Sequence, residues 1–289
     1  MLVIFRVKFN VAFVAGDSSR RKATDMRMCT LICAGVLGGV FVSHGFPDFS
    51  DNFNLYNDGD LAGQGPWLQT GTIATTPIQI NAGRAQLGTA GQDIYAAFGA
   101  PITSSDGTSL YVGLTINVTS AQAAGDYFFH LSNPAGTTTS FYNRLFARSL
   151  GGGFELGFLD ISGIGSTITY GGVELSLATD HRVVIAQNFV AGALNDTFSL
   201  YVNPTDLAIE ANNSPYLTHI WTSATAETAT YAAANLRQGT AANAAALFVD
   251  DLVISSVFSD VAPVPEPHFA ALFGGLGLLM WTYFRRNRR

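Results

Sequence analysis

The chain has 289 residues, of which 12% are charged and 30 are glycine. Long helices stabilised by Glu–Lys pairs are therefore not expected, and the many Thr, Ser, Asn, Gly and aromatic residues favour strands joined by tight turns. Residues 45–266 contain five basic and 19 acidic residues, a net charge of −14. A surface of that charge repels phosphate, which excludes nucleic acid as an expected partner.

A basic segment followed by an apolar one lies near the N-terminus. Met26–Met28 carries one arginine, and Cys29–Val42 is an apolar run of 14 residues without charge. Small residues follow at the positions that would precede cleavage after Gly45. This order is typical of a secretory signal peptide. We therefore expect a leader in residues 1–45, with a signal helix at about 26–45, and export of the remainder.

Both cysteines of the chain, Cys29 and Cys33, lie inside this apolar run. Removal of the signal would leave a protein without cysteine. Disulfides, thiol catalysis and cysteine-ligated zinc are then not expected in the exported protein.

Alternation of apolar and polar residues recurs through residues 46–262 and indicates half-buried strands. The clearest runs are 110–119, 154–159, 182–190, 197–202 and 247–257. Turn signals rich in Gly, Asn, Asp and Pro separate them, and no stretch keeps a 3.6-residue period over three turns. The pattern predicts an all-β domain built as a two-sheet sandwich over 46–262. The residues expected inside it are Val112, Leu114, Ile116, Val183, Ile185 and Leu200.

Short fragments of this region resemble a known class of jelly-roll domains found in sorted surface proteins. They are Phe49–Phe53, Asp58–Leu61, Gly65–Trp67, Ser199–Pro204, Leu236–Gly239 and Val249–Ile254. The resemblance implies a concanavalin A-like (laminin G-like) sandwich whose first and last strands lie close together. Asp51 would then lie near Asp250 or Asp251. These fragments are strand and turn signatures, so they imply a fold and not an activity.

Three elements follow one another in the segment 263–289. Pro265, Glu266 and Pro267 precede His268–Phe284, which is 17 residues long and uncharged when His268 is neutral. A helix of that length spans about 25 Å, the lower limit for crossing a bilayer, so a transmembrane helix is expected at about 268–284. Four arginines follow it and should stay cytoplasmic, which places the body outside. They are Arg285, Arg286, Arg288 and Arg289.

The order of these elements resembles the PEP-CTERM sorting signal of Gram-negative bacteria. The resemblance implies processing by an exosortase, with Pro265, Glu266 and Pro267 as the recognition motif and the arginine cluster as the stop signal. It also implies inner-membrane anchoring at the C-terminus during sorting, followed by delivery to the cell surface or extracellular matrix. An ordinary tail anchor is the alternative.

No catalytic constellation is evident in the sequence. Glycosidases need two carboxyl groups facing one groove. Glu155 is the only glutamate well inside an apolar strand pattern, and the next residues on its face are Gly and Leu, so we expect it to face solvent. His130, His181 and His219 lack the spacing of zinc ligands and are expected on strand surfaces.

Two groups of acidic residues could supply the oxygen ligands that calcium prefers. One is Asp58 with Asp60 in a turn, and the other is Asp51 with Asp250 or Asp251. The alternative is that these residues cap turns through their own backbone. No other cofactor is expected.

The sequence therefore favours an exported surface or matrix protein whose sandwich is structural or binds glycan weakly. Trp67 and Trp221 are the residues expected to contact a glycan. The alternative is a hydrolase that acts on extracellular polysaccharide. A carboxylate pair in the sandwich would favour the hydrolase, aromatic side chains would favour the binder, and an unadorned surface would favour structure.

Overall fold

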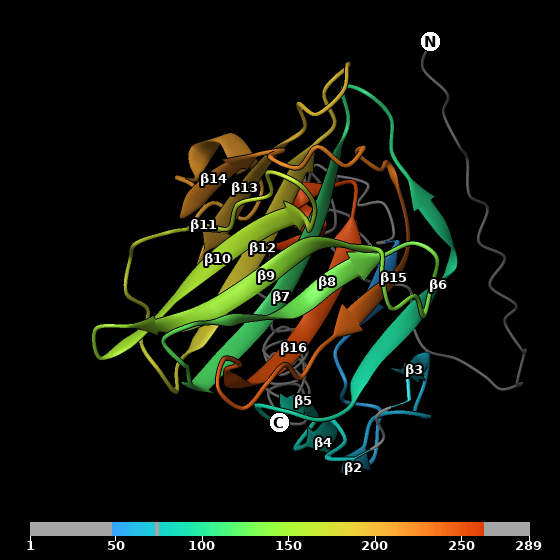
Figure 1. Ribbon diagram of the computed structural model, residues 1–289, viewed down its shortest axis with the longest axis vertical. Coiled ribbons are helices and arrows are strands. Elements are labelled where there is room, and N and C mark those ends of the chain that lie inside the picture. The colour runs from blue at the N-terminus through green and yellow to red at the C-terminus, as the bar shows by residue number, and fades with distance from the viewer. Residues whose placement is uncertain (1–47, 73–74, 263–289) are drawn as a thin grey trace, which may run out of the picture. The chain divides into compact units, whose positions relative to one another are not determined.

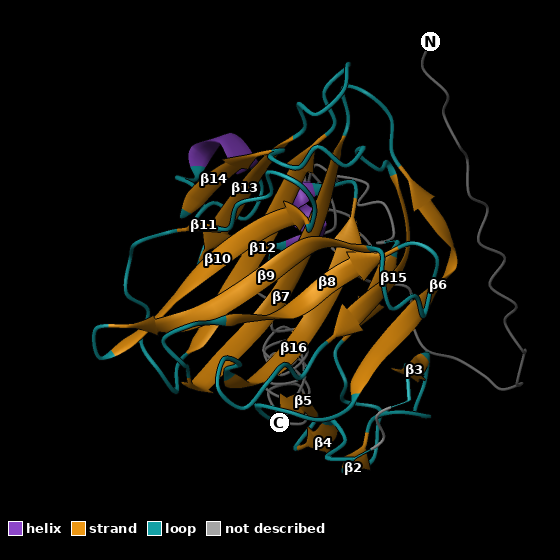
Figure 2. Ribbon diagram, in the orientation of Figure 1, coloured by secondary structure: helices purple, strands orange, loops and turns teal. Residues whose placement is uncertain are grey.

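Two antiparallel sheets stacked face to face make up the part of the chain that the computed structural model describes, residues 48–72 and 75–262 (Figure 1). Strands and loops account for nearly all of it, as Figure 2 shows. The expected signal helix and the expected helix at 268–284 lie outside these residues. Among the described residues, no helix is long and apolar enough to cross a membrane.

The first sheet has nine strands in the order β14-β13-β12-β7-β16-β5-β4-β2, with β1 also paired to β16. The strands are β1 (Phe49–Asp51), β2 (Gly59–Asp60), β4 (Gln79–Asn81), β5 (Arg84–Leu87), β7 (Ser109–Ser120), β12 (Asp180–Asn188), β13 (Thr197–Val202), β14 (Leu217–Ile220) and β16 (Ala246–Ser255). The long strands at its centre carry the alternating patterns that the sequence shows most clearly.

The second sheet has seven strands in the order β11-β10-β9-β8-β15-β6-β3, and Figure 1 shows it in front of the first. The strands are β3 (Trp67–Thr70), β6 (Asp93–Thr103), β8 (Asp126–Ser132), β9 (Phe141–Leu150), β10 (Gly153–Ile161), β11 (Thr169–Tyr170) and β15 (Thr230–Leu236). The two short helices of the described region are the 3-10 turn η1 (Glu210–Asn212) and α1 (Phe258–Val261).

The core lies between the sheets and confirms the sequence prediction of a two-sheet sandwich. All six residues expected inside are at most 1% exposed. The largest fully buried side chains around them include Trp67, Tyr231, Phe53, Phe129 and Phe154. Each such side chain contributes about 1.5–3 kcal/mol when it leaves water, so this layer is the main source of stability.

The first and last strands of the sandwich are neighbours, as the fold resemblance implies. Strand β1 pairs antiparallel with β16, and Asp51 lies opposite Leu252. This pairing closes the domain and brings Asp51 beside the Asp250–Asp251 pair. The sequence-predicted domain 46–262 contains all the described residues.

Candidate functional site

The outward side of the second sheet carries an unusual concentration of arginine. In β9, Leu145 and Ala147 belong to the core, so the alternating residues Arg144 and Arg148 point away from it. Arg237 follows β15 directly. Three of the five arginines between residues 45 and 266 therefore lie on one side of one sheet. We call this surface the arginine face, defined by Arg144, Arg148, Arg237, Tyr127, Phe141 and Tyr170.

At one end of the arginine face, Arg148 is held by a carboxylate and a ring. Its Nε donates to Oε1 of Glu155 at 2.7 Å, across the β9–β10 pair. Its guanidinium lies 3.6 Å from the centre of the Tyr170 ring. Tyr170 in turn covers Gly157, where a Cβ would come within 2.6 Å of the ring. Glycine at 157 therefore lets Tyr170 lie flat against the sheet.

At the other end, Arg237 lies between two carboxylates. Its Nη1 is 2.8 Å from Oδ1 of Asp126, and its Nε is 3.8 Å from Oδ2 of Asp93. Burial raises the pKa of Asp93 to about 6, despite the opposing effect of Arg237. A carboxyl group with a pKa near neutrality is able to act as a general acid.

The centre of the arginine face is aromatic and holds Arg144. Its guanidinium lies 4.8 Å from the centre of the Tyr127 ring and 5.4 Å from that of Phe141. Arg237 lies 4.1 Å from the same Tyr127 ring. Beneath them, His130 packs 4.4 Å from Phe141, centre to centre. The rings of His130 and Phe141 both lie beside the side chain of Arg144. Phe141 and Tyr127 are half-buried.

The structure corrects the expectation that Glu155 faces solvent. Glu155 is 2% exposed, since the loop after β11 folds over it and the backbone N–H of Gly172 donates to Oε2 at 2.8 Å. Arg148 neutralises the carboxylate that this burial would otherwise leave unpaired. The sequence pattern singled out Glu155 but not its burial, because the placement of the loop over it does not follow from strand alternation.

The expectation that the three histidines lie on strand surfaces is also wrong. His181 and His219 pack against core phenylalanines, and His130 is covered on the outward side by Tyr127 and Phe141. Their exposures are 3% for His130, 6% for His181 and 3% for His219. Oγ1 of Thr169 lies 2.8 Å from Nδ1 of His219, and Nε2 of His219 lies 3.6 Å from Asp160. Asp160 already accepts backbone N–H groups of Ile161 and Thr222. This group is a buried structural network and not a nucleophile with its base.

The two tryptophans expected to contact glycan are buried. Trp67 is 0% exposed, stacks on Phe53 and donates its Nε1–H to Asp51 at 2.8 Å. Trp221 is 5% exposed and donates to the carbonyl oxygen of Thr225 at 3.0 Å. Neither indole face is open to a ligand. Large apolar rings inside a sandwich core are common, and sequence alone did not separate that role from a surface role.

Asp51 and Asp251 line one pocket of about 460 Å³, together with Tyr56, Leu55 and Pro66. Asp51 is already engaged: Oδ1 accepts from the backbone N–H of Phe53, and Oδ2 accepts from the hydroxyl of Tyr56 and from Trp67. Its carboxylate therefore organises the first turn of the domain. Asp250 lies on the neighbouring strand position, and burial raises its pKa to about 6.

Asp58 and Asp60 act as turn caps. Asp58 accepts from the backbone N–H of Ala82 at 3.1 Å, and Asp60 accepts from that of Ala62 at 2.9 Å. Calcium takes six to eight oxygen ligands. In residues 48–72 and 75–262, no group of three or more His, Cys, Asp or Glu side chains is arranged to hold a metal ion. Asp58 and Asp60 are thus each engaged with a backbone N–H group.

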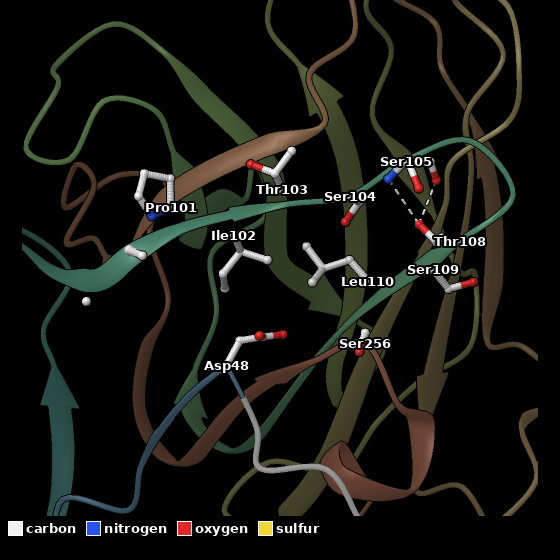
Figure 3. Close-up of a pocket in the computed structure, with 12 residues that line it drawn as sticks. Asp48, Pro101, Ile102, Thr103, Ser104, Ser105, Thr108, Ser109, Leu110 and Ser256 are labelled. Atoms are coloured by element: carbon white, nitrogen blue, oxygen red, sulfur yellow. Dashed lines mark hydrogen bonds between the residues drawn. The ribbon is translucent and has the colours of Figure 1, made fainter.

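A second pocket, of about 470 Å³, lies between the end of β6 and the start of β7 (Figure 3). Asp48 and Ser256 lie across from these strands. The other polar side chains are hydroxyls, and Thr108 bonds back to the carbonyl oxygen of Ser105 at 2.6 Å. Asp48 is its one ionisable lining residue. The pocket offers hydrogen bonds to a ligand but no acid–base pair.

Comparison with known proteins gives fold likeness only. No family model matches the chain, and no curated protein matches its sequence. Similar solved structures include an endo-β-1,4-glucuronan lyase from Trichoderma reesei, with 10% identity, a TM-score of 0.39, and coverage of 75% of this chain and 98% of that one. Domain 4 of the arabinanase AbnA from Geobacillus stearothermophilus, in complex with arabinotriose, has 14% identity, a TM-score of 0.43, and coverage of 75% and 98%.

The botulinum neurotoxin serotype D/C binding domain has 10% identity and a TM-score of 0.46, and the match covers 80% of this chain and 52% of that one. The chain thus spans about half the length of that toxin domain. Identities this low and TM-scores below 0.5 leave the ligand and activity of this chain to be argued from its own residues.

Proposed function

We propose that this chain is an exported surface or matrix protein whose sandwich binds glycan through the arginine face. The observation that carries the proposal is the grouping of half-buried Tyr127, Phe141 and Tyr170 with three arginines on one side of one sheet. Aromatic rings offer apolar surface beside polar groups, and guanidinium groups donate several hydrogen bonds in a fixed fork. That combination suits a ligand with both apolar faces and many hydroxyls.

A glycan array probed with the full-length chain tests this proposal. The chain is kept in a polyoxyethylene detergent, because sugar-based detergents would compete, and the array is run with and without calcium. Binding that is lost in Tyr127→Ala and Tyr170→Ala and kept in Tyr95→Ala supports the arginine face. An array without any bound glycan overturns glycan binding and leaves a structural role.

A hydrolase acting on extracellular polysaccharide is the second candidate, and Asp93 is the observation that favours it. Its pKa of about 6 suits a general acid, and Asp126 is close enough for both carboxylates to contact Arg237. Both carboxylates are, however, engaged by that same arginine, which opposes a free acid–base pair. Release of reducing ends from a polysaccharide by the wild type, abolished in Asp93→Asn, would establish the hydrolase.

We further propose that the chain is sorted through Pro265, Glu266 and Pro267 by an exosortase-type enzyme. The support comes from the sequence: the motif, the apolar segment and the arginine cluster occur in the expected order. Prolines disfavour helix interiors and strand ladders, so the motif should stay extended and accessible. Guanidinium groups cross hydrocarbon at a cost of several kcal/mol, so the terminal arginines would retain the helix.

The substitution Glu266→Ala tests sorting without touching the sandwich. We expect normal export and folding but no conversion of the membrane-retained form to the released form in a host with the enzyme. Glu227→Ala, within the domain, serves as the control. Processing of Glu266→Ala at the wild-type rate would mean that the motif is a linker before an ordinary tail anchor.

A further inference from the structure

Arg144, at the centre of the arginine face, lacks the counter-charge that a buried guanidinium requires. It is 9% exposed. Its hydrogen bond among the described residues runs from Nη1 to the hydroxyl of Ser162, and its Nε is sealed from solvent without a partner. No carboxylate in the described region forms an ion pair with it, whereas Arg148 has one such partner and Arg237 has two. A buried charge without a partner is costly, so a partner from outside the fold would be bound favourably.

The carboxylates whose field reaches Arg144 are Asp126 and Asp160, and both are committed elsewhere. Asp126 accepts from Arg237 at 2.8 Å and from the backbone N–H of Tyr127 at 2.8 Å. Asp160 is fully buried and accepts from the backbone of Ile161 and Thr222. Turning either one toward Arg144 would break bonds that hold a strand or a loop. The missing charge is therefore not available from these two residues.

One terminal nitrogen of Arg144 reaches solvent. Its Nη2 has no protein partner among the described residues and is not sealed from solvent, unlike its Nε. Its Nη1 is bound to Ser162, which is exposed and can turn away. The two terminal nitrogens of a guanidinium match the two oxygens of a carboxylate. The site is thus prepared for a carboxylate that arrives from solution.

We propose that Arg144 binds the carboxylate of an acidic sugar residue, an inference that rests on the proposed binding of glycan by the arginine face. The half-buried rings of Tyr127 and Phe141 lie against the guanidinium and limit its movement. A rigid donor fork loses little freedom on binding, which favours affinity. The neighbouring rings also give the sugar an apolar surface beside its charged group.

The charge of the domain defines the ligand further. Residues 45–266 carry a net charge of −14, so a polysaccharide with a carboxylate on every sugar is repelled. An isolated carboxylate on an otherwise neutral glycan avoids most of that repulsion, because salt screens charges beyond about 8 Å at physiological ionic strength. The expected ligand is therefore a mostly neutral glycan with single acidic residues.

His130 is a second buried group in the same cluster without a polar partner. Neither of its ring nitrogens has a hydrogen-bond partner in the described region. Burial, followed by the charges of Arg144 and Arg237, lowers the pKa of His130 well below its usual range, so the ring is neutral. The guanidinium of Arg144 is therefore the group that selects a negatively charged ligand, and His130 packs beneath Phe141.

Two trisaccharides that differ in one group test the inference. The probes are cellotriose and the same trisaccharide with a terminal glucuronic acid in place of glucose, titrated calorimetrically into the full-length chain in polyoxyethylene detergent. We expect the acidic probe to bind about tenfold more tightly, because a charge-assisted, two-point hydrogen bond is added. Arg144→Gln should remove the preference, Arg144→Lys should keep part of it, and Arg84→Gln, on the other sheet, should leave it unchanged.

The outcomes separate the inference from the function on which it rests. Equal binding of the two probes by the wild type, or a preference that survives in Arg144→Gln, overturns the role of Arg144 while glycan binding stands. Binding on the array that is confined to neutral glycans would likewise overturn the role of Arg144 while glycan binding stands. No binding of either probe together with an array free of bound glycan overturns both. Thermal unfolding of each variant confirms that it is folded.

Discussion

Each outer face of the sandwich contains one nearly buried arginine, and the two differ in what surrounds the guanidinium. Arg182 on the first sheet is 8% exposed, and Arg144 on the second is 9% exposed. Arg182 donates from Nε and Nη2 to the carbonyl oxygen of Val261, and from Nη1 to that of Asp251 at 2.7 Å. Arg144 has one serine hydroxyl and two rings.

The difference follows from what covers each face. The end of the domain returns over the first sheet, where Phe258, Val261 and Ala262 pack on Tyr111 and Tyr201. The carbonyl oxygen of Val261 in that segment, together with that of Asp251 in β16, supplies the acceptors that Arg182 needs. Over Arg144 the described chain supplies rings but no carbonyl or carboxylate. The protein itself therefore satisfies the guanidinium on one face, whereas on the other the described residues leave it without a counter-charge.

The largest expected effect is that of Arg182→Met. The substitution leaves the buried carbonyl oxygen of Val261 and the partly buried one of Asp251 without their donor, so we expect a loss of about 3 kcal/mol in unfolding free energy. Denaturant unfolding measures it. Arg84→Met, which breaks the ion pair with half-exposed Asp180, should cost less than about 1 kcal/mol. Similar losses in the two variants would mean that Arg182 does not hold the end of the domain.

Glycines on the two faces sharpen the same comparison. An added Cβ at Gly113 would lie 2.4 Å from both Nη2 of Arg182 and the carbonyl oxygen of Val261. Gly113→Ala should therefore cost about 2 kcal/mol, because the packed segment must shift. Gly157→Ala on the arginine face meets the half-buried Tyr170 ring at 2.6 Å and the side chain of Ile168 at 3.2 Å, both of which can turn aside, and should cost less than about 1 kcal/mol. Equal costs in thermal or denaturant unfolding would contradict the idea that only the first face is sealed.

Sequence alone predicted the sheets well and the site poorly, for physical reasons that particular residues illustrate. Val112, Leu114 and Ile116 alternate with polar residues, and a two-residue period sets which face is buried. Glu155 and His130 lie at outward positions of the alternating patterns in their own strands. A loop nevertheless buries Glu155, and neighbouring rings bury His130. Trp67 was expected outside and lies in the core.

The arginine face itself was not predicted, although one signal was available. The domain has no lysine and only five arginines, and two of them, Arg144 and Arg148, lie four residues apart in one strand. Residues at that spacing share a face of a strand. Arg237 joins them through the strand order β9-β8-β15, which sequence patterns do not give.

Arg144→Met should leave stability unchanged or raise it by up to about 1 kcal/mol, in contrast to Arg182→Met. The reason is that the described residues supply no counter-charge for Arg144, so removing the guanidinium removes a desolvation cost. The losses are the bond to Ser162 and the cation–π contacts with Tyr127 and Phe141, and methionine keeps apolar contact with both rings. Denaturant unfolding in the absence of glycan measures it. A loss as large as that of Arg182→Met would show that Arg144 holds the fold together.

The smallest expected effect is a change of stability with pH, to which one carboxyl group on each face contributes. Burial raises the pKa of Asp93 on the arginine face and of Asp250 on the first sheet to about 6. The folded state then binds more protons than the unfolded state between about pH 4 and pH 6, so both carboxyl groups lower stability as pH rises through that range. Asp93→Asn and Asp250→Asn should each reduce this decline. A bound acidic glycan at Arg144 should steepen the decline that depends on Asp93, because a further negative charge nearby raises the pKa of that carboxyl. The decline that depends on Asp250 should stay the same. Thermal unfolding at several pH values, with and without the acidic trisaccharide, measures both, and a ligand effect on the Asp250 component alone would place the anion on the wrong face.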